Sequence, residues 1–324
     1  MTAAAALELD NIRVRYGSHL AVDGVTLRVG RGEIVGLLGP NGSGKSSTLA
    51  AAAGVIEPEA GTVSVDGIAR AADPCGFAKR IGLVPQEPAL YDELSAESNL
   101  VFFGRLYGLG GPDLRKKVDL ALTRVRLIDR ADDRVSTFSG GMKQRLNLAC
   151  ALLHGPLVLL LDEPTAALDP ASRDALFADL HDLRDAGHAI LLSTHHLDEA
   201  ESGCDRIAVL EAGKLVASGK PHDLIRRQPG NRAVLYAHLR EALPRFFVRG
   251  LQQRADDGVE IEIVGRRLRL SANSHESLGR ALAMVLADGI VLDAFRTPPG
   301  RLDCLLRGVP VEPDATEPVA PPRR

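Results

Sequence analysis

The chain of 324 residues contains no tryptophan, and it has only four tyrosines and four cysteines. Because the cysteines form no C-x-x-C pair, they predict reduced, partly buried thiols rather than a disulfide framework or a cysteine metal site. No apolar run approaches the roughly 18 residues that a membrane-spanning helix needs. The first residues also lack the basic region and the long apolar core of a secretory signal. These absences favour a cytoplasmic protein with no membrane span of its own.

An excess of charge of one sign is missing as well. Lysine and arginine number 39 against 42 acidic residues, and the net charge of −3 argues against a nucleic-acid partner. Apolar residues make up 45% and charged residues 25% of the chain, which is typical of a globular protein. The length is enough for two modest domains.

Residues 39–46 fit the phosphate-loop pattern G-x-x-x-x-G-K-[ST] completely. An apolar run precedes them and a helix-forming run follows, which is the strand–loop–helix context that this motif requires. Glycines let backbone N–H groups approach a phosphate, and the helix N-terminus adds positive potential. We expect Lys45 to reach the β- and γ-phosphates of ATP and Ser46 to bind Mg²⁺. The predicted ATP-binding residues of this segment are Gly39, Pro40, Asn41, Gly42, Ser43, Gly44, Lys45, Ser46 and Ser47.

Two acidic residues, Asp162 and Glu163, follow the unbroken apolar run 157–161. Such a run is typical of a strand that is buried on both faces of a parallel sheet. The carboxyl end of such a strand is where α/β proteins bind ligands, so we expect Asp162 to contribute to the Mg²⁺ site. The alternative is that both acids simply begin a solvated loop.

Further motifs gain weight from their order along the chain, since each one alone has an ordinary structural explanation. Ser139-Gly140-Gly141 opens a predicted helix over 142–153 and could be a plain helix cap. Gln86 follows a short strand and could be a surface glutamine. Asp169 precedes Pro170 and could be a helix N-cap. Tyr16 could pack at a strand end, and His195 could join His196, Asp198 and Glu199 in a metal site.

Together these motifs resemble those of the ATP-binding cassette (ABC) ATPases, and the resemblance covers roughly residues 7–228. Phe138 and Met142 depart from the leucine and glutamine that are commonest in this family, and Met142 is therefore left out of the site. The resemblance implies a role for each motif. Tyr16 would stack on adenine, and Ser46, Gln86 and Asp162 would contact Mg²⁺. The catalytic residues would be Glu163, which polarises the attacking water, Gln86, which also reaches that water, and His195, which faces the γ-phosphate. Ser139, Gly140 and Gly141 would contact ATP bound by a facing subunit, and Asp169 would cross the interface.

The implied function is that of a nucleotide-binding subunit that hydrolyses ATP, with Mg²⁺, to power a membrane transporter. The chain holds one phosphate loop, so it must form a homodimer or pair with a related cassette. It would act on separate transmembrane permease subunits, as a peripheral protein on the cytoplasmic face of the membrane. Residues 142–146 and 195–201 resemble drug-exporter cassettes of the daunorubicin-resistance type, which favours export. The alternative is a soluble ABC ATPase that acts on a complex outside the membrane.

The implied fold is α/β, a P-loop NTPase of ABC type with a mixed α/β core, a β-rich antiparallel part and a helical subdomain over about 87–156. Helices are predicted at 95–107 and 112–125. A cassette over 1–228 is followed by a small α+β accessory domain over 231–309 and a disordered, proline-rich tail over 310–324. Within the accessory domain we expect a hairpin of 259–264 with 267–271, a helix at 277–287, a strand at 290–295 and a helix at 299–307.

Overall fold

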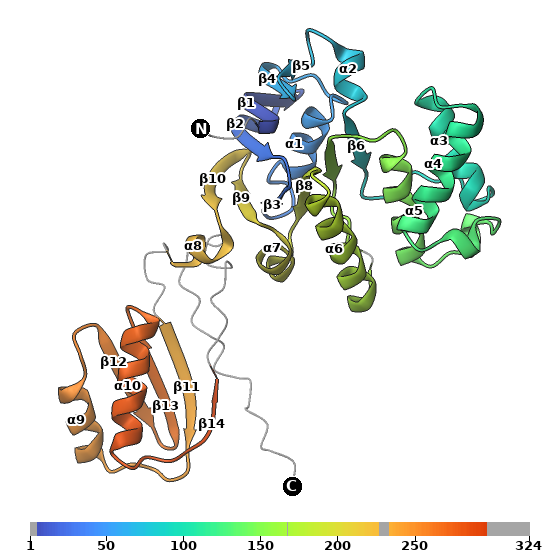
Figure 1. Cartoon of the computed structure of the whole chain (residues 1–324). Helices are drawn as coiled ribbons and strands as arrows, with labels where there is room; N and C mark the ends of the chain where they lie inside the picture. The colour runs from blue at the N-terminus through green and yellow to red at the C-terminus, as the bar shows by residue number, and fades with distance from the viewer. Residues whose placement is uncertain (1–4, 167, 227–232, 297–324) are drawn as a thin grey trace. The chain divides into compact units, whose positions relative to one another are not determined.

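The computed structural model describes residues 5–166, 168–226 and 233–296, and Figure 1 shows their arrangement. The chain divides into two compact units, Met1–Pro221 and His222–Arg324, so the division falls at the start of α8 (Pro221–Arg226). The domain limits expected from the sequence stay predictions. The linker around 228–231, the helix at 299–307 and the tail at 310–324 lie outside the described residues, as does Cys304.

Two β-sheets form the framework of the first unit. A four-stranded antiparallel sheet has the order β2-β1-β4-β5, and a six-stranded sheet has the order β10-β9-β3-β8-β7-β6. In the second sheet only the edge strand β10 runs antiparallel to its neighbour. The strands are β1 (Ala5–Tyr16), β2 (His19–Gly30), β3 (Glu33–Leu38), β4 (Ala60–Val65), β5 (Ile68–Ala69), β6 (Ile81–Val84), β7 (Val158–Leu161), β8 (Ala189–Thr194), β9 (Arg206–Glu211) and β10 (Lys214–Gly219).

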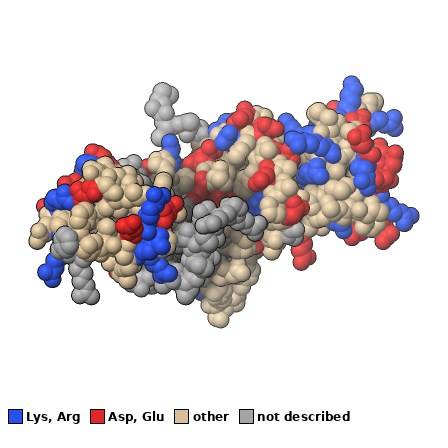
Figure 2. All heavy atoms as spheres, turned by 90° about the horizontal axis from the view of Figure 1, so that it is seen from below, with Lys and Arg blue, Asp and Glu red and all other residues tan. Residues whose placement is uncertain are grey.

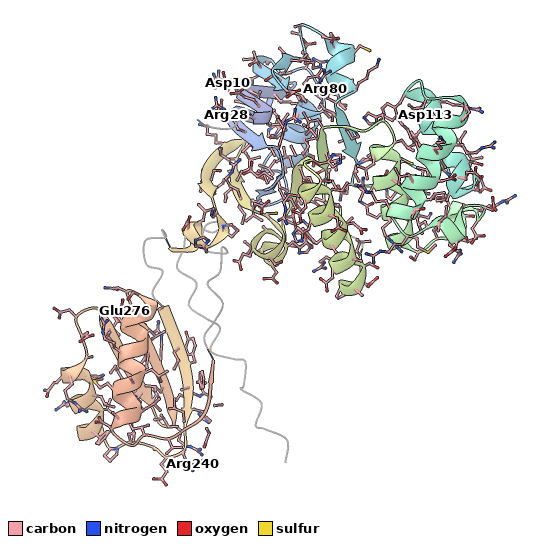
Figure 3. All side chains as sticks on the ribbon, viewed as in Figure 1. Asp10, Arg28, Arg80, Asp113, Arg240 and Glu276 are labelled. Carbon is pink, nitrogen blue, oxygen red and sulfur yellow. The ribbon has the colours of Figure 1, made fainter. Side chains whose placement is uncertain are left out.

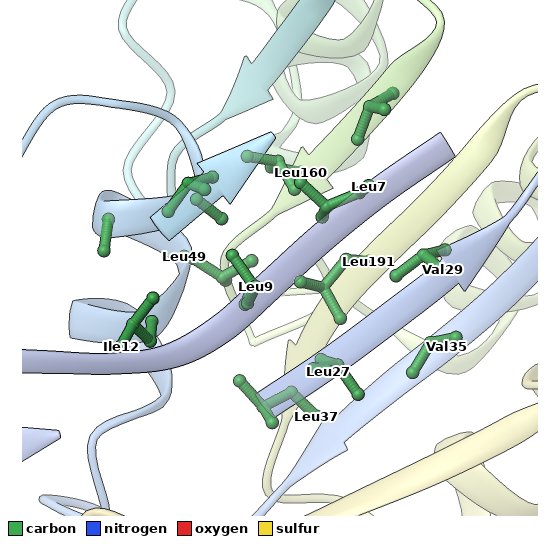
Figure 4. Close-up of a cluster of buried hydrophobic side chains, with 14 of the residues drawn as sticks. Leu7, Leu9, Ile12, Leu27, Val29, Val35, Leu37, Leu49, Leu160 and Leu191 are labelled. Atoms are coloured by element: carbon green, nitrogen blue, oxygen red, sulfur yellow. The ribbon is translucent and has the colours of Figure 1, made fainter. Parts of the chain in front are cut away.

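The main core lies around the helix α1 (Lys45–Ala52), which contacts strands of both sheets. Figure 4 shows Leu49 of α1 among Leu9 of β1, Leu160 of β7 and Leu191 of β8. All residues of β7 and β8 are buried, as the apolar run 157–161 predicts for a central parallel strand. The helices α6 (Pro170–Asp185) and α7 (Leu197–Gly203) pack against β3 and β8, and α2 (Pro74–Ala78) lies near β5. Helices thus pack against the six-stranded sheet and hold its strands in place.

A helical subdomain with its own core stands to one side of the six-stranded sheet (Figure 1). It contains α3 (Ala96–Leu106), α4 (Gly111–Arg124) and α5 (Gly140–Leu152), with short 3₁₀ turns at Ile128–Arg130 and Val135–Thr137. The three predicted helices of this region are confirmed. The helix α5 begins two residues earlier than expected, because Ser139 is its N-cap and accepts a hydrogen bond from the N–H of Met142.

The second unit has the element order β-α-β-β-α-β and a four-stranded antiparallel sheet in the order β12-β13-β11-β14, which is a ferredoxin-like arrangement. The predicted hairpin and strand are confirmed, and the predicted helix begins two residues early because Ser274 caps it. In Figure 3, Arg240 and Glu276 mark opposite ends of this unit. Its elements are β11 (Ala233–Leu239), α9 (Arg245–Arg254), β12 (Val259–Val264), β13 (Arg267–Ala272), α10 (His275–Ala287) and β14 (Leu292–Arg296).

The surface carries charges of both signs, and on the face in Figure 2 basic and acidic side chains are interspersed. Among the described residues, no helix combines the length and apolar character needed to cross a bilayer. Cys75 is exposed, whereas burial raises the pKa of the Cys150 and Cys204 thiols to about 12. Both buried thiols therefore stay protonated and unreactive at neutral pH.

Candidate functional site

The phosphate loop runs from the end of β3 into the first turn of α1, and its course requires glycine at two points. Gly44 has φ +101°, and a Cβ atom there would lie 2.4 Å from the carbonyl oxygen of Ala21. At Gly39, a Cβ atom would lie 2.3 Å from the carbonyl oxygen of Leu210. Neither clash can be relieved by turning a side chain, since both involve backbone atoms. The loop therefore depends on these two glycines for its shape.

Polar groups suited to an anion line this loop. Lys45 is buried, and its Nζ donates hydrogen bonds to the carbonyl oxygens of Gly39 at 2.8 Å and Pro40 at 3.1 Å. The Oγ of Ser43 is buried and has no hydrogen-bond partner among the described residues. A buried hydroxyl without a partner is costly unless something else binds it. Together with the ammonium group and the N-terminus of α1, it fits a phosphate group of a nucleotide.

Asp162 lies next to the loop at the carboxyl end of β7. Its Oδ1 accepts hydrogen bonds from Ser46 Oγ at 3.1 Å and from Ser193 Oγ at 2.6 Å. A serine hydroxyl beside a carboxylate is the kind of oxygen donor set that Mg²⁺ prefers. Ser46 and Asp162 come from segments that are far apart in the sequence, so the fold itself creates this donor pair.

Glu163 is held in an unusual backbone conformation, with φ +43°. A non-glycine residue in the left-handed region carries strain of about 1–3 kcal/mol, and such residues cluster at functional sites. The N–H of Glu163 donates a hydrogen bond to Ser193 Oγ at 2.8 Å, which fixes the turn. Ser193 therefore positions both acidic residues. Sequence reasoning missed this role, although a polar residue directly before Thr194 and His195 at the end of an apolar strand is a usable signal.

The side chain of Glu163 brings three predicted site residues together. Its Oε1 lies 3.6 Å from Lys45 Nζ and 3.2 Å from His195 Nδ1, and its Oε2 lies 3.5 Å from Gln86 Nε2. Lys45 follows β3, Gln86 follows β6, and His195 follows β8. Because these strands are parallel to β7, their carboxyl ends meet at one edge of the sheet. The predicted site residues around Glu163 thus form a single polar cluster.

The remaining predicted site residues lie outside that cluster. Within the described residues, no hydrogen bond or ion pair links Tyr16, Ser139 or Asp169 to Lys45 or Glu163. Tyr16 is exposed beside the turn that joins β1 and β2. Ser139 and Gly140 are exposed at the start of α5.

Asp169 is the N-cap of α6, as one of the two sequence interpretations predicted. Its carboxylate accepts hydrogen bonds from the N–H and the hydroxyl of Ser172, at 3.0 Å and 2.6 Å. These bonds hold the pKa of Asp169 below its ordinary value. The side chain of Ser172 has room because residue 141 is glycine, since a Cβ atom on Gly141 would lie 2.7 Å from Ser172 Oγ. The starts of α5 and α6 are therefore packed together.

The alternative metal site around His195 finds no support in the geometry. The rings of His195 and His196 lie side by side, with centroids 4.1 Å apart. Glu199 is buried and accepts hydrogen bonds from Thr165 and Thr194. Across residues 5–166, 168–226 and 233–296, no group of three or more His, Cys, Asp or Glu side chains is arranged to hold a metal ion.

The sequence and the fold are similar to those of known proteins. The family model described as "ABC transporter" matches residues 22–166. The linearmycin resistance ATP-binding protein LnrL of Bacillus subtilis (strain 168) is 38% identical over 228 residues, which are 70% of this chain and 73% of that protein. The Nod factor export ATP-binding protein I of Paraburkholderia xenovorans (strain LB400) is 43% identical over 234 residues, which are 70% and 74% of the two chains. A solved structure described as the ATP binding subunit of an ABC transporter is 36% identical, with a TM-score of 0.63 over 70% of this chain and 94% of its own.

Proposed function

Since the chain belongs to the ABC transporter ATP-binding family, whose members hydrolyse ATP to power transport, we propose that it is the motor subunit of a membrane exporter. The predicted fold class and the predicted enzyme class, an ATPase, are confirmed by the same likenesses. Support for export comes from the relatives, which are named for linearmycin resistance and for Nod factor export. The cargo of this chain would be bound by separate membrane subunits.

The observation that carries the catalytic part of the proposal is the convergence of Lys45, Gln86 and His195 on Glu163. The N–H groups of the phosphate loop and Lys45 would bind the phosphates of ATP, and Tyr16 would stack on adenine. Ser46, Asp162 and Gln86 would hold Mg²⁺, which neutralises phosphate charge when it is bound. Glu163 would accept a proton from the attacking water, while Gln86 and His195 hold the water and the γ-phosphate in place.

We further propose that ATP lies between two cassettes. The exposure of Ser139 and Gly140, and their lack of hydrogen bonds to the cluster around Glu163 among the described residues, support contact with a nucleotide on another subunit. The N-terminus of α5 carries positive potential that suits an anion, as the N-terminus of α1 does at the phosphate loop. Asp169, at the adjacent start of α6, would lie at the interface. Each site would then combine Lys45 of one copy with Ser139 and Gly141 of the other.

An apolar patch of Tyr91, Phe102 and Leu106 supports a separate membrane partner. Tyr91 and Phe102 pack edge to face with ring centroids 4.9 Å apart, and all three side chains are exposed. The buried side chain of Asn99 fixes the backbone at Tyr91 through hydrogen bonds of 2.8 Å and 3.0 Å, so the patch is ordered. Exposed apolar surface of this kind marks interaction sites. The patch begins five residues after Gln86, where a docked subunit could act on the catalytic cluster.

The direct test is to trap the tagged Glu163→Gln chain with ATP in gently solubilised native membranes and to identify what copurifies. We expect a multi-span membrane protein at a stoichiometric ratio, which would place the cassette on the cytoplasmic face of the membrane. Leu106→Asp should lose this partner, whereas Leu120→Asp should keep it. Leu120 is a matched control, since it is 68% exposed like Leu106 and lies in the same subdomain on α4. Recovery of a soluble complex in place of a membrane protein would favour the alternative function.

A further inference from the structure

A buried glutamate below the catalytic cluster has no role in the function proposed so far. Glu199 lies in α7 and is only 3% exposed. Acidic side chains are almost never buried so completely unless they are paired, because the carboxylate loses its hydration. The neighbouring Asp198 is exposed, so the burial belongs to Glu199 and not to the whole turn.

Three partners surround the Glu199 carboxylate. Its Oε2 accepts hydrogen bonds from the hydroxyls of Thr165 and Thr194, both at 2.8 Å. Its Oε1 lies 3.2 Å from Nε of Arg173, which makes an ion pair, although the two atoms do not have the geometry of a hydrogen bond. We call these four residues the Glu199 cluster.

Each partner belongs to a segment that carries a predicted site residue. Thr165 lies two residues after Glu163, Thr194 lies directly before His195, and Arg173 lies in the first turn of α6, which Asp169 caps. Thr194 also accepts a hydrogen bond at its Oγ1 from the N–H of His196, at 2.9 Å. One carboxylate therefore connects the loop after β7, the turn after β8 and the start of α6.

We propose that Glu199 is a positioning residue for ATP hydrolysis, which rests on the function proposed above. Through Thr194 it sets the turn that carries His195, and through Thr165 it sets the turn that carries Glu163. Through Arg173 it ties both turns to the helix start that would face the second cassette. Small displacements of reacting groups lower the rate of a chemical step strongly, whereas phosphate binding by the loop at α1 does not depend on this cluster.

Substitutions at Glu199 and Thr194 test the contact with Arg173 and the threonine hydrogen bond separately. In Glu199→Gln, the amide oxygen can still accept from both threonines, but the amide NH₂ then faces Arg173 and the ion pair is lost. Thr194→Val keeps the shape of the side chain and removes the hydroxyl, and Thr194→Ser restores the hydroxyl. Asp198→Asn is the matched control, because it removes an exposed charge one residue away.

The experiment measures kcat and KM for ATP on the full chain, with the fraction of active sites determined by nucleotide titration. We expect Glu199→Gln and Thr194→Val to lower kcat per site by about tenfold to a hundredfold. KM should stay within about twofold of the unsubstituted chain if the loop alone binds the phosphates. Thr194→Ser and Asp198→Asn should keep the original kcat.

The opposite results would overturn the proposal. A purely structural role predicts a smaller fraction of active sites with unchanged kcat per site, or a Thr194→Ser variant as impaired as Thr194→Val. If Glu199→Gln does not fold, the comparison of Thr194→Val with Thr194→Ser tests the proposal by the same two quantities, kcat per site and the fraction of active sites. Lack of ATP hydrolysis by the unsubstituted chain would contradict the proposed function and this inference together. A normal rate of ATP hydrolysis by the unsubstituted chain, together with unchanged kcat in Glu199→Gln and Thr194→Val, would overturn this inference alone.

Discussion

At the scale of single residues, Glu163 combines a strained backbone with three convergent side chains. Its φ of +43° would relax in a solvated loop, so the contacts to Ser193, Lys45 and His195 must hold it there. The side chains that converge on Glu163 support the proposed role at the reacting phosphate, which the family resemblance implied and which stays a prediction.

Replacing Glu163 by glutamine should keep ATP binding and remove most of the turnover. The amide keeps the size of the side chain but cannot accept a proton, and general-base catalysis is worth about 10²–10⁴-fold in rate. Steady-state ATPase assays together with an ATP-binding titration would check this. The exposed Glu241 provides the control Glu241→Gln, which should behave like the unsubstituted chain. Unchanged turnover in Glu163→Gln would remove this residue from its proposed role.

Replacing Lys45 by alanine should weaken ATP binding itself. A charged hydrogen bond is worth about 1.5–3 kcal/mol, which corresponds to about a tenfold to hundredfold loss of affinity. Equilibrium titration with a fluorescent ATP analogue would measure it, with the exposed Lys79→Ala as control. Normal affinity in Lys45→Ala would contradict the assignment of the phosphate loop.

The sequence was informative for residues in contiguous motifs, but it did not reveal the partners of residues that act across the fold. Asp162 and His195 lie at or just after the end of an apolar run, and Lys45 belongs to the phosphate-loop motif at the start of α1, so their places could be predicted. Ser193 and Glu199 take their roles from partners more than thirty residues away, such as Asp162 and Thr165. No local pattern encodes such a pairing, because it depends on which strands become neighbours in the sheet.

At the scale of elements, the helical subdomain is joined to the sheet through His154, which lies just after the C-cap of α5, Leu153. His154 stacks on Tyr107 with ring centroids 3.8 Å apart, and its Nε2 lies 2.9 Å from the carbonyl oxygen of Ile81 in β6. Its Nδ1 is buried, and no residue in the described part of the chain forms a hydrogen bond with it. A proton added to Nδ1 would be buried without an acceptor, and burial accordingly lowers the pKa of His154.

This arrangement predicts that the cassette loses stability in mild acid. The pKa values of His154 and His188 are both lowered in the folded state by burial, so the unfolded chain binds protons first. Stability should be highest above the ordinary histidine pKa of about 6.5 and should fall as the pH drops below it. Urea unfolding between about pH 8 and about pH 5 would measure the slope. His154→Gln should reduce that slope, while the exposed His19→Gln should leave it unchanged.

Some elements could not be predicted from the sequence. The strand β11 and the helix α9 were not anticipated, because β11 is a single alternating run of seven residues that is not set off by a tight turn. The strand β11 pairs with both β13 and β14, so it lies in the interior of the sheet. The hairpin of β12 and β13 was predictable, since Gly265 and Arg266 form a tight turn between two alternating runs.

At the scale of the whole molecule, the proposal of a shared site makes a complementation experiment decisive. A Lys45→Ala chain and a Ser139→Arg chain should each be inactive alone. When they are mixed with ATP, the mixed dimer contains one site with an intact Lys45 and an intact facing Ser139, so ATPase activity should reappear. Activity is measured against the mixing ratio and should peak near equal amounts. If each chain used its own Ser139, mixing would restore nothing.

The position of Ser139 on α5, apart from the phosphate loop on α1, has a genetic consequence. Two defective copies of such a chain can restore each other when their defects lie on opposite sides of the shared site. An allele that disables Lys45 and an allele that disables Ser139 should therefore complement each other in the same cell, provided that both chains still pair. Alleles that disable Lys45 and Glu163 should not complement, because each copy then lacks a residue on the same side of the site, so the complementation pattern would distinguish a shared site from a self-contained one.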